Sequence, residues 1–272
     1  LSAELTKRGV SDVLRKGFRY ISELFDMYYP LPSELNPTAK KYYEKNIFCV
    51  TRQLFYSANN TDSIDVMLSL NGLPIMTMEL KNHYTGQTIE NAIKQYQNDR
   101  NPKEDTSALL LMKKRCAVHF AVDDDLIMMC TELCGKSSWF LPFNKGVNGG
   151  AGNPANPTGI RTSYLWEDIL GKHSLSDILE NYAQVVKKKK RVKDKKTGKK
   201  KDVEKELVIW PRYHQLDAVR QMLDATRKGG VGQKFLIQHS AGSGKSNSIT
   251  WLAYQLVGLL DGTTPLLDSV IV

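Results

Sequence analysis

The sequence predicts an α/β protein in which a mixed sheet flanked by helices is followed by the beginning of a second α/β unit. Two observations lead to this prediction. Ser63–Asn82 contains two apolar runs joined at Asn71-Gly72, which is the strongest short signal for a β-hairpin. Further along, an apolar strand, a glycine-rich turn and an apolar helix follow one another within residues 233–260.

Composition limits the classes of protein to which the chain can belong. An apolar content of 41% with 25% charged residues is typical of a soluble globular protein, and no apolar run reaches the ~20 residues of a membrane span. The first residues lack the apolar core of a signal peptide and an initiator Met, so we expect a cytoplasmic protein with residues missing upstream. The four cysteines lack paired spacing, which indicates free thiols rather than disulfides or a zinc site.

The net charge of +9 comes from one segment. Lys187–Lys201 holds eleven Lys or Arg and one Asp, a charge of +10, so the remaining chain carries about −1. Such a block is a self-repelling, solvated linker in its free state, and it is also suited to contact phosphates. We therefore predict a first domain over residues 1–186, a lysine-rich linker or insert over 187–204, and a second, truncated domain over 205–272.

The elements before the hairpin follow from apolar spacing and prolines. Residues 1–46 read as helical, with the apolar side chains of Asp12–Phe25 on one face. Pro37–Lys45 predicts a short helix with Pro37 at its first position. Asn46–Tyr56 is a strand that leads into the hairpin, which gives a three-strand meander.

The hairpin carries Asp65, Glu79 and Lys81 in an otherwise apolar stretch. Side chains alternate along a strand, so Glu79 and Lys81 share a face. A strict two-residue turn would place Asp65 opposite Met78 and turn it away from that face. The three residues therefore meet only if the hairpin has an odd-length loop or a β-bulge.

These residue types suit metal-dependent phosphodiester cleavage. Mg²⁺ prefers carboxylate oxygens, so Asp65 and Glu79 are the candidate metal ligands. The carbonyl of Leu80 is a possible third ligand, and Lys81 would orient or deprotonate the attacking water. Glu44 is either a further acid at this site or an exposed residue. The alternative for the whole set is a solvated sheet face on which Glu79 and Lys81 are merely neighbours.

Four segments follow the hairpin. Ile89–Arg100 predicts a helix, and Cys116–Val122 and Leu126–Thr131 predict a second hairpin around three aspartates, which we take as a solvated turn. Trp139–Thr158 is a loop whose first aromatic residues suggest anchoring to the protein body. Ser163–Val186 predicts a further helix.

The second motif lies between a predicted strand, Phe235–Gln238, and a predicted helix that ends near residue 260. Backbone N–H groups at such a helix start hold the phosphates of ATP. Lys245 would neutralise the terminal phosphates and Ser246 would bind the accompanying Mg²⁺. His239 stands where a strict motif has its first glycine. The candidate nucleotide-binding residues of this turn are Gly242, Ser243, Gly244, Lys245 and Ser246.

Both motifs resemble those of known families. The hairpin resembles the Asp…Glu-x-Lys core of the PD-(D/E)-x-K nuclease superfamily, whose next helix often carries Gln-x-x-x-Tyr. Gln95 matches that glutamine as a catalytic residue, although Asp99 stands in place of the tyrosine. The turn resembles the P-loop of superfamily 2 helicases, which have RecA-like motor domains. WPRYHQ resembles their glutamine motif, in which Gln215 would bind adenine.

In this order, the nuclease core, WFLPFN…GAGNP, YLWEDIL, RYHQ and AGSGKS resemble the R subunit of type I restriction-modification enzymes. The resemblance implies an ATP-dependent type I site-specific deoxyribonuclease, in which an Mg²⁺-dependent endonuclease is coupled to a DNA translocase. Its implied partners are double-stranded DNA and the methyltransferase and specificity subunits. The motor motifs beyond the P-loop are missing, so we expect this fragment to be incomplete for ATP hydrolysis. The alternative is an ATP-dependent helicase with a non-catalytic N-terminal domain that binds DNA or a partner.

Overall fold

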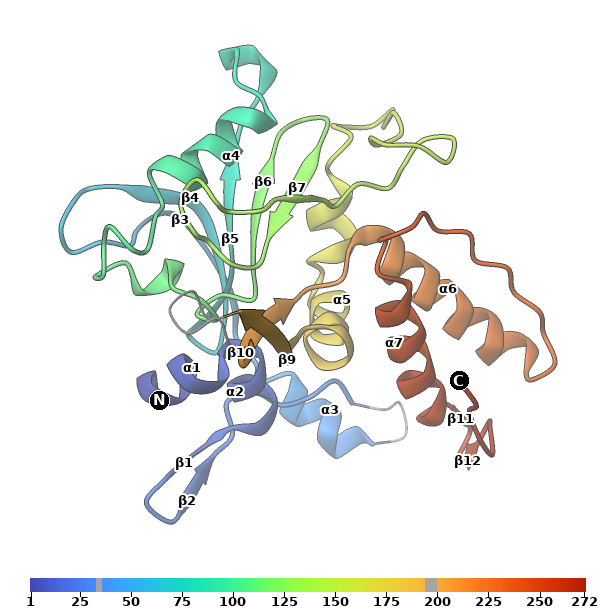
Figure 1. Ribbon diagram of the computed structural model, residues 1–272. Helices are drawn as coiled ribbons and strands as arrows, with labels where there is room; N and C mark the ends of the chain where they lie inside the picture. The colour runs from blue at the N-terminus through green and yellow to red at the C-terminus, as the bar shows by residue number, and fades with distance from the viewer. Residues whose placement is uncertain (33–35, 194–199) are drawn as a thin grey trace.

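The computed structural model describes residues 1–32, 36–193 and 200–272, and its centre is a six-stranded mixed sheet (Figure 1). The strand order is β3-β4-β5-β6-β7-β8, with β5 and β6 parallel and the other neighbours antiparallel. The strands are β3 Phe48–Phe55, β4 Ser63–Leu70, β5 Leu73–Leu80, β6 Val118–Val122, β7 Ile127–Cys130 and β8 Leu141–Pro142. The mixed sheet flanked by helices, the meander and the second hairpin are thus confirmed.

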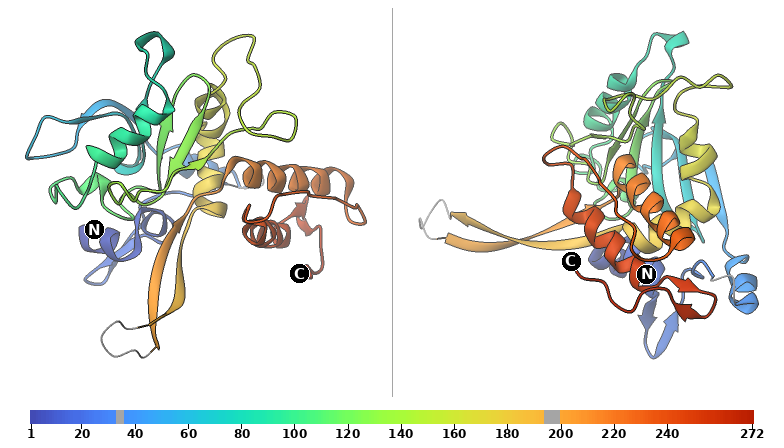
Figure 2. Two further views of the ribbon diagram at one scale, coloured as in Figure 1. Left: turned by 45° about the horizontal axis from the view of Figure 1, so that its top comes forward. Right: turned by 90° about the vertical axis from the view of Figure 1, so that its right-hand side faces the viewer.

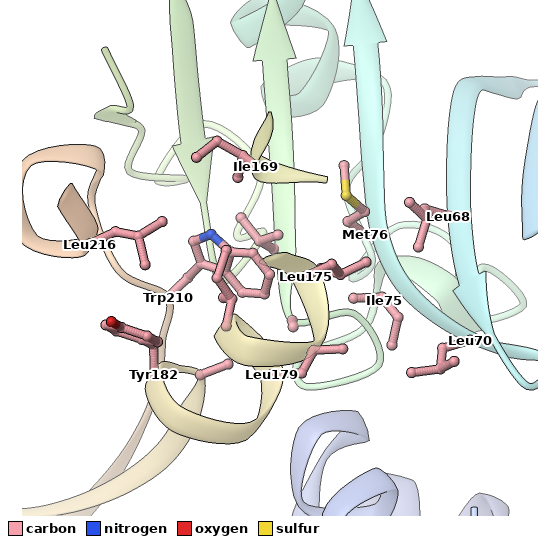
Figure 3. Packing of buried hydrophobic residues seen from close by; sticks show 14 of the residues in the cluster. Leu68, Leu70, Ile75, Met76, Ile169, Leu175, Leu179, Tyr182, Trp210 and Leu216 are labelled. Carbon is pink, nitrogen blue, oxygen red and sulfur yellow. The ribbon is translucent and has the colours of Figure 1, made fainter. Parts of the chain in front are cut away.

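Helices cover both faces of the sheet. Helix α4 (Ile89–Asn98) lies in the β5–β6 crossover that a parallel pair requires, and it buries Ala92 and Tyr96 against one face. The other face carries α2 (Val10–Lys16) and α5 (Lys172–Asp177), the latter flanked by the π-helical turns η3 (Leu165–Ile169) and η4 (Ile178–Tyr182). Figure 3 shows Leu175 and Leu179 packed toward Ile75 of the sheet. The last predicted helix, Ser163–Val186, is therefore interrupted and ends at Tyr182.

The N-terminal region corrects one prediction. Helices α1 (Ser2–Arg8) and α2 are followed by a small hairpin of β1 (Phe18–Tyr20) and β2 (Glu23–Phe25), so the helix predicted over 12–25 is wrong beyond Lys16. Gly17 ends α2 at φ +61°, in the left-handed region that favours glycine. Helix α3 (Pro37–Tyr43) is confirmed, and the Asn36 side chain caps it by accepting from the Ala39 N–H at 2.9 Å.

The lysine-rich segment forms a long antiparallel hairpin that extends from the protein body (Figure 2). Its strands are β9 (Gln184–Lys193) and β10 (Lys200–Ile209). Of the two alternatives for 187–204, a linker or an insert, the described part of this segment has the form of an ordered insert. Acidic residues of β10 lie opposite basic residues of β9, as in Glu204 opposite Lys189, and this pairing offsets the repulsion. Residues 194–199 of the basic run lie outside the described residues.

The C-terminal segment contains α6 (Tyr213–Gly229), α7 (Lys245–Val257) and a short hairpin of β11 (Leu260–Asp261) and β12 (Thr264–Pro265). The strand predicted at Phe235–Gln238 is absent: these residues have no strand partner in the described chain, and the Leu236 side chain is 92% exposed. A strand needs a neighbour that bonds its N–H and C=O groups. The described residues around the glycine-rich turn therefore include no parallel sheet.

One apolar core joins the sheet to the C-terminal helices. Leu216 of α6 and Trp251 of α7 belong to the same buried cluster as Leu68 and Ile75 of the sheet. Trp210, which precedes α6, meets Phe120 of β6 edge-on, with ring centroids 6.4 Å apart. The core thus crosses the boundary predicted near residue 205.

No helix in the described ranges is long and apolar enough to cross a membrane.

Candidate active site

The β4–β5 hairpin has a register that brings the two predicted carboxylates together. Leu70 lies opposite Leu73, so the turn is the two-residue Asn71-Gly72, with φ values of +50° and +81°. A β-bulge between Leu68 and Ser69 then shifts the register, and Val66 lies opposite Met78. The next pair, one step farther from the turn, is therefore Asp65 opposite Glu79. The predicted bulge is therefore confirmed, whereas the alternative of an odd-length loop is wrong because Asn-Gly favours a two-residue turn.

Asp65 is held at the end of β5 by two hydrogen bonds. Its Oδ2 accepts from the Leu80 backbone N–H at 2.8 Å, and its Oδ1 accepts from Gln53 Nε2 at 3.0 Å. The Gln53 backbone has φ +49°, and its Oε1 accepts from the Ser63 hydroxyl at 2.8 Å. The carboxylate is thus oriented from both neighbouring strands while it remains half-exposed.

Glu79 is fully buried, and its two oxygens have different surroundings. Oε1 accepts a hydrogen bond from Arg100 Nε at 3.0 Å, whereas Oε2 is buried without a partner among the described residues. Burial raises the pKa of Glu79 to about 8; the Arg100 charge opposes this rise and the nearby Asp65 charge adds to it. A buried carboxyl oxygen without a partner is costly, so this oxygen is suited to a ligand.

Arg100 is a site residue that the sequence analysis missed. It lies two residues beyond α4, and its side chain crosses to the sheet, where Nη2 donates to the Ser63 carbonyl at 2.8 Å. Its guanidinium also lies 5.3 Å from the Tyr56 ring centroid and 3.7 Å from Asp62 Oδ2. A lone arginine at the end of a predicted helix gives no local signal that it will pair with an acid on a strand.

Lys81 and Gln95 lie at the margins of this group. The Lys81 backbone N–H donates to the Val122 carbonyl at 2.9 Å, which extends the β5–β6 pairing and keeps Lys81 on the Glu79 face. Gln95 is half-buried on α4 and lines, with Arg100, a cavity of about 510 Å³. Within the described chain neither side chain is hydrogen-bonded to Asp65 or Glu79. The structure therefore joins Asp65, Glu79 and Arg100 and places the other two beside them.

A buried polar cluster fastens α4 to the sheet beside Glu79. Thr77 Oγ1 lies 2.8 Å from the Tyr96 hydroxyl and 2.7 Å from His119 Nδ1. Burial lowers the pKa of His119 to about 3, so this imidazole stays neutral. Because Thr77 and Glu79 share a face of β5, the cluster fixes the distance between the sheet and the helix that carries Gln95.

The donor atoms suit a hard cation. Asp65, Glu79 and the Leu80 carbonyl offer only oxygen, which favours Mg²⁺ over zinc. The buried Glu79 Oε2 without a partner is the observation that fits a bound ion. In the described ranges there is no cluster of three or more His, Cys, Asp or Glu, so only two carboxylates meet here. Glu44, which was expected to be either a further acid of this site or an exposed residue, is exposed directly after α3.

The predicted solvated turn of three aspartates is wrong for Asp123. This side chain is 4% exposed, and its carboxylate accepts from the Ile89 N–H at 2.8 Å and from the Leu126 N–H at 2.7 Å. Asp123 therefore ties the start of α4 to the β6–β7 turn.

The expected anchoring of the loop after β7 is present at Phe143, which is fully buried, but not at Trp139, which is 76% exposed.

The glycine-rich turn leads directly into α7, which begins at Lys245. Gly242 and Gly244 have φ values of +71° and +85°, and Ser243 lies buried between them. Lys245 Nζ donates to the carbonyls of His239 at 3.1 Å and Ser240 at 2.9 Å, so it closes the loop on itself. Ser246 is exposed in the first turn of α7.

The predicted glutamine motif contacts this loop. Gln215 Nε2 donates to the Gly244 carbonyl at 2.9 Å, and its Oε1 accepts from the Arg212 N–H at 2.9 Å. Arg212 Nη2 also donates to the Gly242 carbonyl at 3.0 Å. Gln215 is 3% exposed, and both the Nε2 and the Oε1 of its amide are hydrogen-bonded to protein groups. The two motifs are thus brought together, with Gln215 holding the loop.

The six-stranded mixed sheet carries two converging carboxylates at one end of its β4–β5 hairpin, which is consistent with a nuclease-like α/β domain. Residues 33–137 match the family described as type I restriction enzyme R protein N terminus. The part of the chain that is similar to this family contains Asp65, Glu79, Lys81, Gln95 and Arg100. The match spans less than half of the chain and ends before the glycine-rich turn. Among curated proteins, no match is found.

Proposed function

We propose that the chain is the nuclease-bearing part of a type I restriction R subunit, in which an Mg²⁺-dependent DNA endonuclease is coupled to an ATP-dependent translocase. The observation that carries the endonuclease role is the bulged register that sets Asp65 opposite Glu79, with Glu79 Oε2 buried and without a partner. The family match over residues 33–137 supports the same role. The proposed partners are double-stranded DNA and the methyltransferase and specificity subunits, in the cytoplasm.

Asp65 and Glu79 would hold the Mg²⁺. When bound, this ion supplies the charge that polarises a phosphodiester and lowers the pKa of a water. Glu79 must first lose its proton, because burial raises its pKa to about 8. Arg100 holds Oε1 and so leaves Oε2 for the site. Lys81, on the same face, would place a positive charge beside the phosphate and orient the water, and Gln95 would position the substrate from α4.

The coupling to ATP rests on the loop before α7. Backbone N–H groups of Gly242, Ser243 and Gly244 and the N-terminus of α7 would hold the phosphates, and Ser246 would bind their Mg²⁺. Lys245 would exchange its two carbonyl contacts for phosphate oxygens. Gln215 would support the loop through Gly244 and bind adenine only after it releases one of its present partners.

The second candidate function is a translocase or helicase with a non-catalytic N-terminal domain. The Glu79–Arg100 ion pair favours this second function, because a buried pair of this kind can have a purely structural role, here the attachment of α4 to β5. In that case Asp65 and Glu79 would be structural residues and no metal would bind between them.

Two variants of the R subunit, assembled with its methyltransferase and specificity subunits, separate these functions. Glu79→Gln is expected to reduce plasmid cleavage by about a hundredfold or more while ATP hydrolysis continues, since it removes a metal ligand. Lys245→Ala is expected to abolish both ATP hydrolysis and cleavage. Glu90→Gln, an exposed acid on α4, is the matched control. Normal cleavage by Glu79→Gln would establish the non-catalytic alternative instead.

A further inference from the structure

The β9–β10 hairpin has two faces of different charge. Its register and the alternation of side chains place every acid of β10 on one face, opposite basic residues of β9. Lys187 Nζ lies 3.0 Å from Glu204, and Arg191 Nε lies 3.3 Å from Asp202. We call this the paired face; it is formed by Lys187, Lys189 and Arg191 of β9 and by Asp202, Glu204 and Glu206 of β10.

The opposite face contains lysines without acids. Lys188 lies directly opposite Lys205, and both side chains are exposed. Neither has an ion-pair partner among the residues that the structure describes. Glu132 lines a cavity together with Lys205, but its carboxylate pairs with Lys113 at 3.0 Å. Like charges opposite each other destabilise a strand pair, so this lysine face, Lys188 and Lys205, is suited to an anion that lies between them.

The shape of the hairpin and the charge of the rest of the chain indicate which anion. Two paired strands of ten residues extend from the protein body (Figure 2), and a two-stranded ribbon fits the major groove of duplex DNA with phosphates on both sides. Outside the basic run the chain carries about −1, so this segment supplies the excess positive charge of the chain.

We propose that the lysine face of β9–β10 contacts the phosphate backbone of double-stranded DNA without reading its sequence. This proposal deepens the proposed function, on which the choice of DNA as the anion rests. The acids of the paired face keep the ribbon folded by offsetting its own charge, and they leave the lysine face as the contact surface. Because lysines act on phosphates as point charges, binding would be independent of base sequence and steeply dependent on salt.

The test measures binding of a fluorescent DNA duplex to the Glu79→Gln chain in EDTA, over a series of salt concentrations, so that no cleavage intervenes. Changing both lysines, Lys188→Ser and Lys205→Ser, is expected to weaken binding about tenfold or more at ~0.1 M salt. It is also expected to reduce the slope of log K against log salt by about 2, since each phosphate contact contributes about 0.9.

Two controls match this variant. Arg191→Asp with Asp202→Arg reverses an ion pair between directly opposed residues of the paired face at constant net charge and should bind like the parent. Lys40→Ser with Lys41→Ser removes the same charge from exposed positions of α3 and should lose clearly less affinity. Equal losses from α3 and from the lysine face would overturn the proposal, as would tighter binding to labelled polyglutamate than to the duplex.

The proposal and the proposed nuclease function fail separately. If the lysine-face variant loses no affinity while Glu79→Gln still abolishes cutting in the assembled complex, the DNA contact is wrong and the nuclease stands. If the salt slope changes as expected while Glu79→Gln cuts normally, the contact stands and the nuclease assignment fails.

Discussion

Glu79 is a buried acid whose two carboxyl oxygens differ in their hydrogen bonding. One oxygen is bonded to Arg100 and the other is without a partner in the described part of the protein. Burial favours the protonated form more than the arginine favours the charged form, so the pKa is raised to about 8. A bound cation would reverse this balance, and Glu79 would then serve as a ligand in its ionised form.

The stability of the metal-free protein should therefore depend on the protonation of Glu79. In the unfolded chain this carboxyl loses its proton near pH 4.5, whereas in the folded protein it keeps the proton until about pH 8. Between these values the folded state binds more protons, so the contribution of Glu79 to stability falls as pH rises. Compared with the parent, Glu79→Gln should gain stability through this window, by at most about 5 kcal/mol. Urea unfolding at a series of pH values in EDTA measures this, and a constant difference would contradict it.

Arg100→Ala should be among the most destabilising single changes at this site. It leaves Glu79 buried without the charged donor that the described chain provides, and removing one partner of a buried ion pair costs about 3–5 kcal/mol. The loss should reach this size only above about pH 8, where Glu79 is ionised, and should be smaller below that value, where the carboxyl keeps its proton. The free energy of unfolding in urea is the measurement, with the nearby exposed Lys103→Ala as a control expected within about 0.5 kcal/mol of the parent. A loss as small as that of the control would mean that the pair does not hold α4.

At the scale of elements, the β4–β5 hairpin places the carboxylates. Asn71 and Gly72 both have positive φ, and the Asn71 side chain accepts from the Ile47 N–H at 2.7 Å and donates to the Met27 carbonyl at 2.9 Å. The turn is thus tied to β3 and to the N-terminal region. With the turn fixed, the bulge at Leu68–Ser69 sets which residues of β4 and β5 face each other at the far end.

Gly72→Ala should destabilise the hairpin by about 1 kcal/mol. A Cβ at this position would meet nothing within 4 Å, so the cost arises from the backbone at φ +81° alone. Gly72→Asn should lose less, because asparagine tolerates this conformation better. Thermal unfolding of both variants gives the comparison, and an equal loss in the two would show that the left-handed backbone is not the cause.

At the scale of the whole molecule, aromatic contacts join the sheet to the C-terminal helices. Trp210 meets Phe120, Tyr213 meets Phe143 at 5.9 Å, and Trp251 of α7 meets Tyr182 at 5.4 Å. Because these residues belong to one apolar cluster or pack against it, the six-stranded sheet and helices α6 and α7 share a core. We therefore expect the described chain to unfold as a single cooperative unit.

Trp210→Ala should lower the free energy of unfolding by about 3–5 kcal/mol, since this side chain is 3% exposed and links β6 to α6. Trp139→Ala, at a 76% exposed position, is the matched control and should have little effect. In the parent protein, tryptophan fluorescence and far-UV circular dichroism should report one coincident transition. Two separate transitions would contradict a shared core and would favour an independent C-terminal unit.

The sequence by itself determined the elements whose signals are local. Apolar alternation with Asn-Gly gave the β4–β5 hairpin, Pro37 gave the start of α3, and the spacing of apolar residues gave α4. The same alternation put Glu79 and Lys81 on one face, and the need for a bulge was already clear from the position of Asp65. These features depend on the period of the backbone and on turn chemistry, which a short segment carries within itself.

Only the tertiary structure decided which distant residues complete each feature. Arg100 reaches Glu79 because α4 packs across β5, and Asp123 is buried because the start of α4 lies above its turn. The described part of the basic run forms strands because the acids of β10 lie opposite it, and Phe235–Gln238 is not a strand because the described chain offers it no neighbour. Hydrogen bonds, ion pairs and burial depend on partners that packing brings together, and no local pattern specifies those partners.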